Sequence, residues 1–338
     1  MAATRDRLPV SRRRFVQGAG VAGLGLLGGL GVLAGQAQSP RKVAPAYRIG
    51  YLGPSLPPPL REDLRELGYV ESQNLLVEYR DPNGQVALLP ELAAELAALP
   101  LDLILAPGVG AARAAQLATS TIPIVGISGD LVEYGLVKSY AQPGGNLTGP
   151  TSGFIPLIGK RLQLLMETVG GVARVAVLGG GSSPPVFPLD PRRHYGEAAQ
   201  ALGIELLALS PQGPEELDAA FKSAVEQRTD ALYVFTSVLA LAHSSRVVAL
   251  AAEYRLPAIY EFPPFVREGG LMAYLGSQRE VIRRAAAFVD KILKGTRPAD
   301  LPVEQAREFD FAINLKTAQA LGLTIPQHVL LQATEVIQ

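Results

Sequence analysis

Two successive series of strand-like and helix-like segments constrain the fold more than any other feature of this sequence. Short apolar runs typical of strands lie at residues 47–52, 75–79, 103–106 and 122–125, and again at 174–178, 204–207, 230–235 and 257–260. Segments of helical character lie between them at 60–67, 87–99, 110–118, 194–201, 215–227 and 239–254. Strands that alternate with helices in this way predict βαβ units and parallel sheets.

The two series also match each other in detail. Glu66-Leu67-Gly68-Tyr69 corresponds to Ala201-Leu202-Gly203-Ile204, and Asp102-Leu103 corresponds to Asp230-Ala231. A duplicated βαβ half accounts for this similarity, whereas a short-period repeat does not. We therefore predict an α/β protein with two Rossmann-like lobes, each with a parallel central sheet, joined by a hinge.

The chain after the second series is expected to cross between the lobes. It supplies one more strand-like run at 272–275, a helix at 280–293 and a Pro-rich tail. We place lobe 1 at residues 46–148 plus about 271–296, and lobe 2 at residues 149–270 plus about 297–338.

The N-terminal segment, residues 1–37, has the layout of an export signal. Arginines precede a long uncharged run, and Gly35 and Ala37 supply the small residues that cleavage requires. The heptapeptide Ser11-Arg12-Arg13-Arg14-Phe15-Val16-Gln17 resembles the consensus of the twin-arginine (Tat) pathway. An uncleaved membrane anchor is the alternative, although many glycines make this stretch a poor helix. The G-x-G-x-x-G at Gly18–Gly23 follows arginines rather than a strand, so we assign it to the signal.

The composition argues against several classes of function. Basic and acidic residues are equal in number, 31 each, which leaves no electrostatic footprint for nucleic acid. The sequence contains no Cys, and this removes thiol nucleophiles, Cys-based metal sites and an anchoring lipidated Cys. The three histidines, His194, His243 and His328, are too far apart for a short metal motif. No P-loop, G-x-S-x-G or H-E-x-x-H occurs, so we expect a protein that is not an enzyme and has no cofactor.

Motifs along nearly the whole chain resemble those of the ABC-transporter substrate-binding family that includes tryptophan-binding-protein-like receptors. They include Glu66-Leu67-Gly68-Tyr69-Val70-Glu71, Pro143-Gly144-Gly145-Asn146-Leu147-Thr148-Gly149, Gly159-Lys160-Arg161-Leu162, Leu256-Pro257-Ala258-Ile259-Tyr260-Glu261-Phe262 and Ile313-Asn314-Leu315-Lys316-Thr317-Ala318. The resemblance implies a type I periplasmic binding protein fold that closes on a small molecule. It also implies an ABC permease and ATPase as partners. We expect a soluble periplasmic monomer, which meets the membrane only through the permease or an uncleaved signal.

The ligand site is expected at the carboxyl ends of the strands, because helix N-termini there offer backbone N–H groups. The resemblance favours an amino-acid-like ligand, which needs an acid for its ammonium group and donors for its carboxylate. Asp130 and Glu261 are the candidate acids. The other candidates are the donors Ser55, Ser182 and Thr236, the loop residues Gly108, Val109, Gly129 and Ser237, and the stacking aromatics Tyr51, Phe154 and Tyr260.

These assignments have alternatives. Asp130 could instead cap a helix, Glu261 could pair with Arg267 on the surface, and the aromatic rings could belong to the core. Lys160-Arg161 is interpreted as part of a solvated face. The family commonly has Pro where this chain has Leu131, so the ligand of a relative cannot be carried over. For the function, the alternatives are a Tat-exported α/β enzyme or cofactor protein, and a ligand-sensing module without transport.

Overall fold

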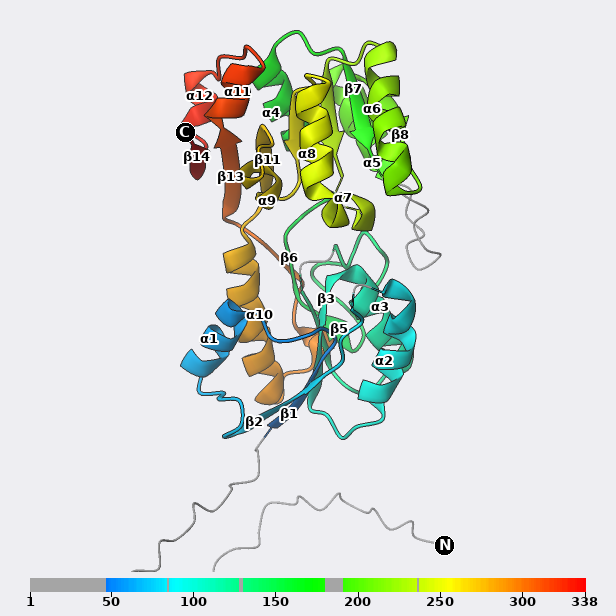
Figure 1. Ribbon diagram of the computed structural model, residues 1–338. Coiled ribbons are helices and arrows are strands. Elements are labelled where there is room, and N and C mark those ends of the chain that lie inside the picture. The colour runs from blue at the N-terminus through cyan, green and yellow to red at the C-terminus, as the bar shows by residue number, and fades with distance from the viewer. Residues whose placement is uncertain (1–46, 84, 128–129, 180–190, 236) are drawn as a thin grey trace, which may run out of the picture. The chain divides into compact units, whose positions relative to one another are not determined.

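The computed structural model describes residues 47–83, 85–127, 130–179, 191–235 and 237–338 (Figure 1). The expected export signal at 1–37 lies outside these ranges, as do the candidate site residues Gly129, Ser182 and Thr236. None of the helices in the described ranges has both the length and the hydrophobicity that a membrane crossing needs. The described chain forms two lobes, each built on its own sheet.

The first lobe contains a parallel sheet of five strands in the order β2-β1-β3-β4-β5. These are β1 (Tyr47–Tyr51), β2 (Leu75–Tyr79), β3 (Leu103–Pro107), β4 (Ile124–Ile127) and β5 (Leu147–Thr148). Helices α1 (Pro58–Glu66) and α10 (Gln278–Leu293) cover one face. The other face is covered by α2 (Leu89–Ala97), with the preceding 3₁₀ turn η1 (Val86–Leu88), and by α3 (Gly108–Ala118). The strands are continuous apolar runs because helices bury both faces of the sheet.

The second lobe repeats this order and extends it. Its sheet runs β14-β13-β11-β10-β9-β7-β8, and the part from β8 to β11 is parallel. The strands are β7 (Arg174–Leu178), β8 (Glu205–Leu209), β9 (Ala231–Val234), β10 (Ala258–Tyr260), β11 (Met272–Gly276), β13 (Phe309–Asn314) and β14 (Glu335–Ile337). The order β8-β7-β9-β10-β11 is that of the first sheet, so the predicted duplication is confirmed.

Helices cover both faces of the second sheet as well. One face packs against α4 (Ile158–Val169), α5 (Pro191–Leu202), α11 (Leu315–Ala320) and α12 (Gln327–Leu330). The other packs against α6 (Leu217–Glu226), which follows the 3₁₀ turn η2 (Pro214–Glu216), and against α7 (Val238–Ala242), α8 (Ser244–Glu253) and α9 (Pro264–Arg267). The single helix predicted at 239–254 is in fact two, because the backbone of His243 leaves the helical conformation.

The duplication extends to individual hydrogen bonds. The Asp102 carboxylate accepts the backbone N–H of Arg48 at 2.6 Å, and the Asp230 carboxylate accepts the backbone N–H of Arg174 at 2.8 Å. In each lobe this aspartate precedes the third strand in chain order and ties it to the first. The sequence similarity between the halves therefore reflects repeated tertiary contacts.

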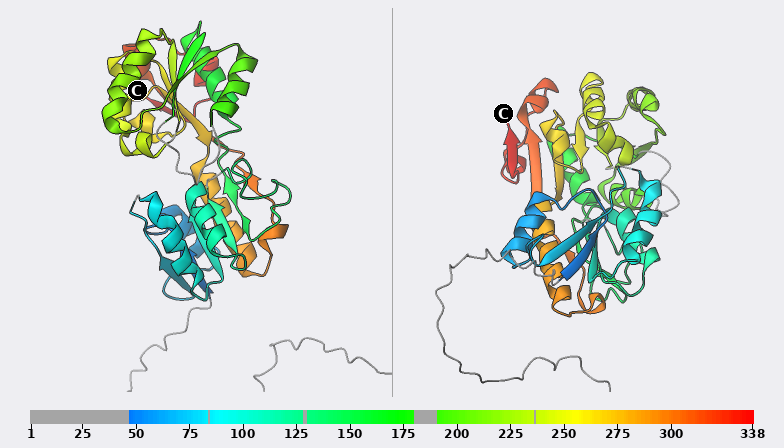
Figure 2. Two further views of the ribbon diagram at one scale, coloured as in Figure 1. Left: turned by 90° about the vertical axis from the view of Figure 1, so that its right-hand side faces the viewer. Right: turned by 60° about the horizontal axis from the view of Figure 1, so that its bottom comes forward.

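Three segments carry the chain between the two sheets and are hydrogen-bonded to one another (Figures 1 and 2). The first contains β6 (Pro150–Thr151), the second joins β11 to α10, and the third contains β12 (Glu304–Gln305), which pairs with β6. The Gly276 N–H donates to Ser152 O at 3.2 Å, and the Ala306 N–H donates to Thr151 O at 2.9 Å. The predicted hinge would lie in this connection.

The structure moves two of the expected lobe boundaries. β11 pairs with β10 and β13 of the second sheet, so the chain returns to the first lobe after Gly276 rather than near residue 271. It then stays there beyond residue 297, through the 3₁₀ turn η3 (Pro298–Asp300), since the Leu301 carbonyl accepts a 2.7 Å bond from Thr148 Oγ1. An apolar strand has the same pattern in either sheet, so periodicity cannot assign it to one.

The tail beyond residue 296 includes regular elements of the second lobe. β13 runs antiparallel to β11, and β14 adds a further strand beside β13 at the edge of the sheet. Asn314 caps α11, because its side chain accepts the Thr317 N–H at 3.1 Å. The Pro-rich tail, for which no elements were predicted, therefore contributes two strands to the second sheet.

Candidate functional site

In the first lobe, the predicted site loops follow β1 and β3, between which the strand order reverses. This reversal is where open α/β sheets offer a crevice to ligands. Ser55 is exposed, and Gly108 and Val109 form the first turn of α3, which has no side-chain cap. Gly108 has φ +77°, a conformation that other residues rarely adopt. The first backbone N–H groups of α3 are thus available as donors.

Two of the three predicted stacking aromatics lie in the core. Tyr51 packs against Tyr79 with ring centroids 6.1 Å apart, and burial, followed by the neighbouring Tyr79, raises the Tyr51 pKa to about 12. Tyr260 is fully buried and stacks on Phe265 at 4.9 Å. Both rings contact core side chains, which was the alternative to ligand contact. Phe154 is half-buried in the first crossing segment.

Asp130 lies after β4 and reaches the first crossing segment. Its carboxylate accepts the Thr151 hydroxyl at 2.8 Å and the Ile155 N–H at 2.9 Å. Burial raises the pKa of Asp130, although these two hydrogen bonds oppose the shift. The Asp130 side chain thus binds the first segment that connects the lobes. This role differs from both interpretations made from the sequence, a helix cap and a ligand contact.

Glu261 follows β10 and forms a buried ion pair with Arg161. The Arg161 Nη1 atom lies 3.4 Å from Glu261 Oε1, and the side chains are 0% and 1% exposed. The Tyr233 hydroxyl donates to the same carboxylate at 2.9 Å. The proposed surface pair with Arg267 is wrong, because Arg267 binds Glu335 instead, with 2.8 Å between Nη2 and Oε2.

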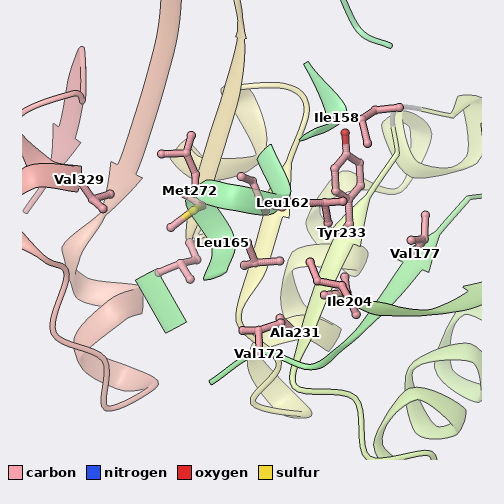
Figure 3. Close-up of a cluster of buried hydrophobic side chains, with 14 of the residues drawn as sticks. Ile158, Leu162, Leu165, Val172, Val177, Ile204, Ala231, Tyr233, Met272 and Val329 are labelled. Atoms are coloured by element: carbon pink, nitrogen blue, oxygen red, sulfur yellow. The ribbon is translucent and has the colours of Figure 1, made fainter. Parts of the chain in front are cut away.

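Arg161 is not among the predicted site residues, because it is interpreted from the sequence as part of a solvated face. In fact its Nε donates to Tyr274 O at 2.6 Å and its Nη1 donates to Phe154 O at 2.7 Å. A signal was present in the sequence, since residues 158, 161, 162 and 165 share one helical face and are all buried. Figure 3 shows Tyr233 beside Ile158 and Leu162 of that face.

The two acids belong to one electrostatic group. After burial and its own hydrogen bonds, Asp130 is influenced by Glu261, which raises its pKa, and by Arg161, which lowers it. Nearby, burial raises the pKa of Tyr134 to about 12, and the charges of Asp130 and Glu261 add to the shift. Both buried carboxyl groups thus lie within electrostatic range of one buried guanidinium, which pairs directly with Glu261.

The second lobe also offers a helix start at this edge of its sheet. Ser237 lies before α7, and its hydroxyl accepts the Ala240 N–H at 3.0 Å as an N-cap. This hydroxyl is therefore engaged in the helix, although it was expected to be a loop residue of the site. Glu261 and Ser237 both follow strands of the parallel part of the sheet, β10 and β9, at their carboxyl ends.

Comparison with known proteins agrees with this architecture. A family model described as "ABC transporter substrate binding protein" matches residues 59–337. A tyrosine-binding protein of Clostridioides difficile is 28% identical over 262 residues, which cover 77% of this chain and 74% of that protein.

Two solved structures show the same fold. One is a conserved domain protein from Vibrio cholerae, with a TM-score of 0.77 and 24% identity over 86% of this chain and 99% of the other. The second is an ABC domain in complex with L-Trp from Streptococcus pneumoniae, with a TM-score of 0.76 and the same identity and coverage. Both support the two-lobed fold of type I periplasmic binding proteins.

Proposed function

The chain belongs to the ABC transporter substrate-binding protein family, and we propose that it binds an aromatic amino acid. The ligand would lie at the carboxyl ends of the two parallel sheets, between the lobes. The names of the relatives support this class of ligand, since one is a tyrosine-binding protein and another was solved with L-Trp.

The observation that carries the proposal is the presence of two buried acids at equivalent strand ends, one of which pairs with a buried arginine. Asp130 follows β4 and Glu261 follows β10, the equivalent strand of the second lobe. Each is 1% exposed, and Arg161 is the partner of Glu261. A ligand ammonium group near these acids would supply the second cation. The N–H groups at the start of α3, which no side chain of the described residues caps, would hold the carboxylate.

The ligand class can be tested by thermal denaturation with matched compounds. L-Phenylalanine, L-tyrosine and L-tryptophan should each raise the melting temperature, because binding to the folded state at about 100 times Kd adds about 2.7 kcal/mol of stability. Phenylpropanoate lacks the ammonium group and phenethylamine lacks the carboxylate, so both should give much smaller shifts. An equal shift with phenylpropanoate would contradict a role for the acids, and mass spectrometry of ligand released from purified protein would identify what is bound instead.

Asp130→Ala should weaken amino-acid binding about tenfold or more, which corresponds to the loss of a charged hydrogen bond. Calorimetric titration measures the affinity, and circular dichroism checks that the variant folds. Asp300→Ala is the control, because Asp300 pairs with Arg297 on the surface. An affinity unchanged in Asp130→Ala would restrict Asp130 to a structural role.

We also propose that residues 1–37 direct export through the Tat pathway and that the mature, monomeric protein delivers its ligand to an ABC permease and ATPase. The twin-arginine motif supports export, and the family supports the transporter. Replacing Arg12 and Arg13 together by Lys should retain the protein in the cytoplasm, as cell fractionation would measure. Periplasmic recovery of that variant would refute the Tat assignment. Ligand uptake that survives deletion of this chain would refute the transport role.

A further inference from the structure

Phe235 lies at the point of the second sheet where the strand order reverses. The chain runs outward from β7 to β8 and then in the opposite direction from β9 through β10 to β11. Phe235 directly follows β9, and its backbone N–H donates at 3.0 Å to the carbonyl of Leu178, the last residue of β7. A reversal of this kind opens a crevice to ligands at the carboxyl ends of the strands. Phe235, which is not among the predicted site residues, therefore lies where the fold favours a ligand.

The side chain of Phe235 lies on the same face of the sheet as the buried ion pair. Side chains alternate along a strand, so Phe235 shares the face of Tyr233, two residues before it, and packs on the same core cluster. The Tyr233 hydroxyl donates to Glu261 at 2.9 Å, and Arg161 contacts the same carboxylate. Phe262, by contrast, packs on the cluster that covers the opposite face. The Phe235 ring and the Glu261 carboxylate thus lie on one side of the sheet, at its carboxyl edge.

Two buried tyrosines fix the position of the Phe235 ring. Tyr195 lies edge-on to Phe235, with ring centroids 6.3 Å apart and an angle of 87° between the planes. Tyr195 packs in the same way on Tyr233, at 4.9 Å and 80°. The two tyrosines are 1% and 0% exposed, whereas Phe235 is only half-buried. The Phe235 ring is therefore held against the core and keeps a part of its surface accessible.

The proposed amino-acid site needs an apolar surface for the ring of its ligand. Tyr51 and Tyr260, which were expected to supply this surface, are 4% and 0% exposed and lie in the core. Phe235 has the accessible aromatic surface that these two residues lack, and it lies at the same edge of the sheet as Glu261. Aromatic rings in contact attract each other by more than the area that they bury. Phe235 is therefore suited to distinguish an aromatic ligand from an aliphatic one.

We propose that Phe235 is the residue of the second lobe that recognises the aromatic ring of the ligand. This inference rests on the proposed binding of an aromatic amino acid and adds the residue that sets the preference for an aromatic side chain. The ring of the ligand packs against the accessible part of Phe235, and Tyr195 supports Phe235 from the core. Loss of the Phe235 ring should therefore weaken the binding of aromatic ligands selectively.

The test compares L-phenylalanine with L-cyclohexylalanine, whose ring is saturated but similar in size, by calorimetric titration of the purified protein. Phe235→Leu should weaken the binding of L-phenylalanine about three- to tenfold, the worth of one aromatic pair, and that of L-cyclohexylalanine much less. Phe235→Met, a second variant without a ring, should give the same pattern. Phe235→Tyr keeps the ring and should retain the preference of the parent protein. Circular dichroism checks that each variant folds.

Phe262→Leu is the matched control. Phe262 follows β10 at the same edge of the sheet and is also half-buried, but it packs on the opposite face, so this variant should keep the affinities of the parent protein. The sequence contains no Trp, so the fluorescence of added L-tryptophan gives a second measurement. Its emission should shift to shorter wavelength on binding, and the titration midpoint should rise in Phe235→Leu but not in Phe262→Leu.

The outcomes separate this inference from the function on which it rests. If the parent protein binds none of these amino acids, the proposed function is refuted, and the role of Phe235 with it. If the parent protein binds them, three results would overturn the inference alone. These are an unchanged affinity for L-phenylalanine in Phe235→Leu, equal losses for both ligands in that variant, and the same selective loss in Phe262→Leu.

Discussion

Arg161 is a cation with no access to water, and its partners come from several parts of the second lobe. The guanidinium bonds the carbonyls of Phe154 and Tyr274 and the side chains of Tyr233 and Glu261. A buried pair of this kind stabilises little relative to apolar residues, but removing one member leaves the other charged and unpaired. The arrangement therefore makes each member intolerant of substitution.

Arg161→Met should lower the free energy of unfolding by about 3–5 kcal/mol, because Glu261 would be left as a buried charge without its cation. Arg267→Met removes a partner from the exposed pair with Glu335, so it should cost about 1 kcal/mol or less. Urea denaturation of the two variants measures the difference. Equal losses would mean that the Arg161–Glu261 pair is energetically no different from a surface pair.

The strand β11 and the helix α10 are joined by a turn with almost no space around it. A Cβ atom at Gly276 would lie 2.5 Å from Ser152 O and 2.8 Å from the Ala306 Cβ, so all three crossing segments meet there. The glycine is required because the segments are hydrogen-bonded backbone to backbone. The close approach of the three crossing segments thus depends on the absence of a side chain at position 276.

Gly276→Ala should destabilise the protein by about 1–3 kcal/mol, the usual cost of forcing an extra methyl into packed surroundings. Gly145→Ala is its control, because a Cβ there meets nothing within 4 Å. Thermal denaturation compares the two variants. If the two variants melt at the same temperature, the crossing segments accommodate the extra methyl group and the close packing at Gly276 adds no stability.

For the molecule as a whole, Glu280 connects two of the crossing segments. It lies in the first turn of α10, and its carboxylate accepts the backbone N–H groups of Arg307 and Glu308, each at 2.7 Å. Burial alone would raise its pKa, but these bonds and the Arg284 guanidinium outweigh burial, and the pKa is lowered. The ionised form therefore stabilises the connection between the lobes.

Glu280→Gln should lower the free energy of unfolding by about 1–3 kcal/mol at neutral pH, because a charged acceptor is replaced by a neutral one. A carboxyl group with a lowered folded-state pKa stabilises the protein above the unfolded value of 4.5 and loses this effect as the pH falls through the folded pKa. The gap between parent and variant should therefore shrink in acid. Denaturation curves measured from neutral pH down to acid pH test this, and a gap independent of pH would contradict it.

Most of the fold was predictable from local patterns. The strands at 75–79 and 174–178 were placed at their observed bounds, and the glycines at 68 and 203 end matching helices with positive φ. For the candidate site, the sequence predicted only its position at the carboxyl ends of the strands and its two candidate acids, Asp130 and Glu261. Ser237 proved to be a helix cap, and Tyr51 and Tyr260 proved to be core, because burial of a ring depends on which helix covers that face.

The sequence by itself determined the order of strands and helices, the duplication of the βαβ half and the apolar faces, because periodicity and turn residues act over a few positions. Only the tertiary structure decided that Arg161 pairs with Glu261, a hundred residues away in the chain, and that Asp130 binds the segment at Thr151–Ile155. Such partners depend on which strand ends meet in space. That meeting is set by sheet order and crossings, which no local pattern encodes.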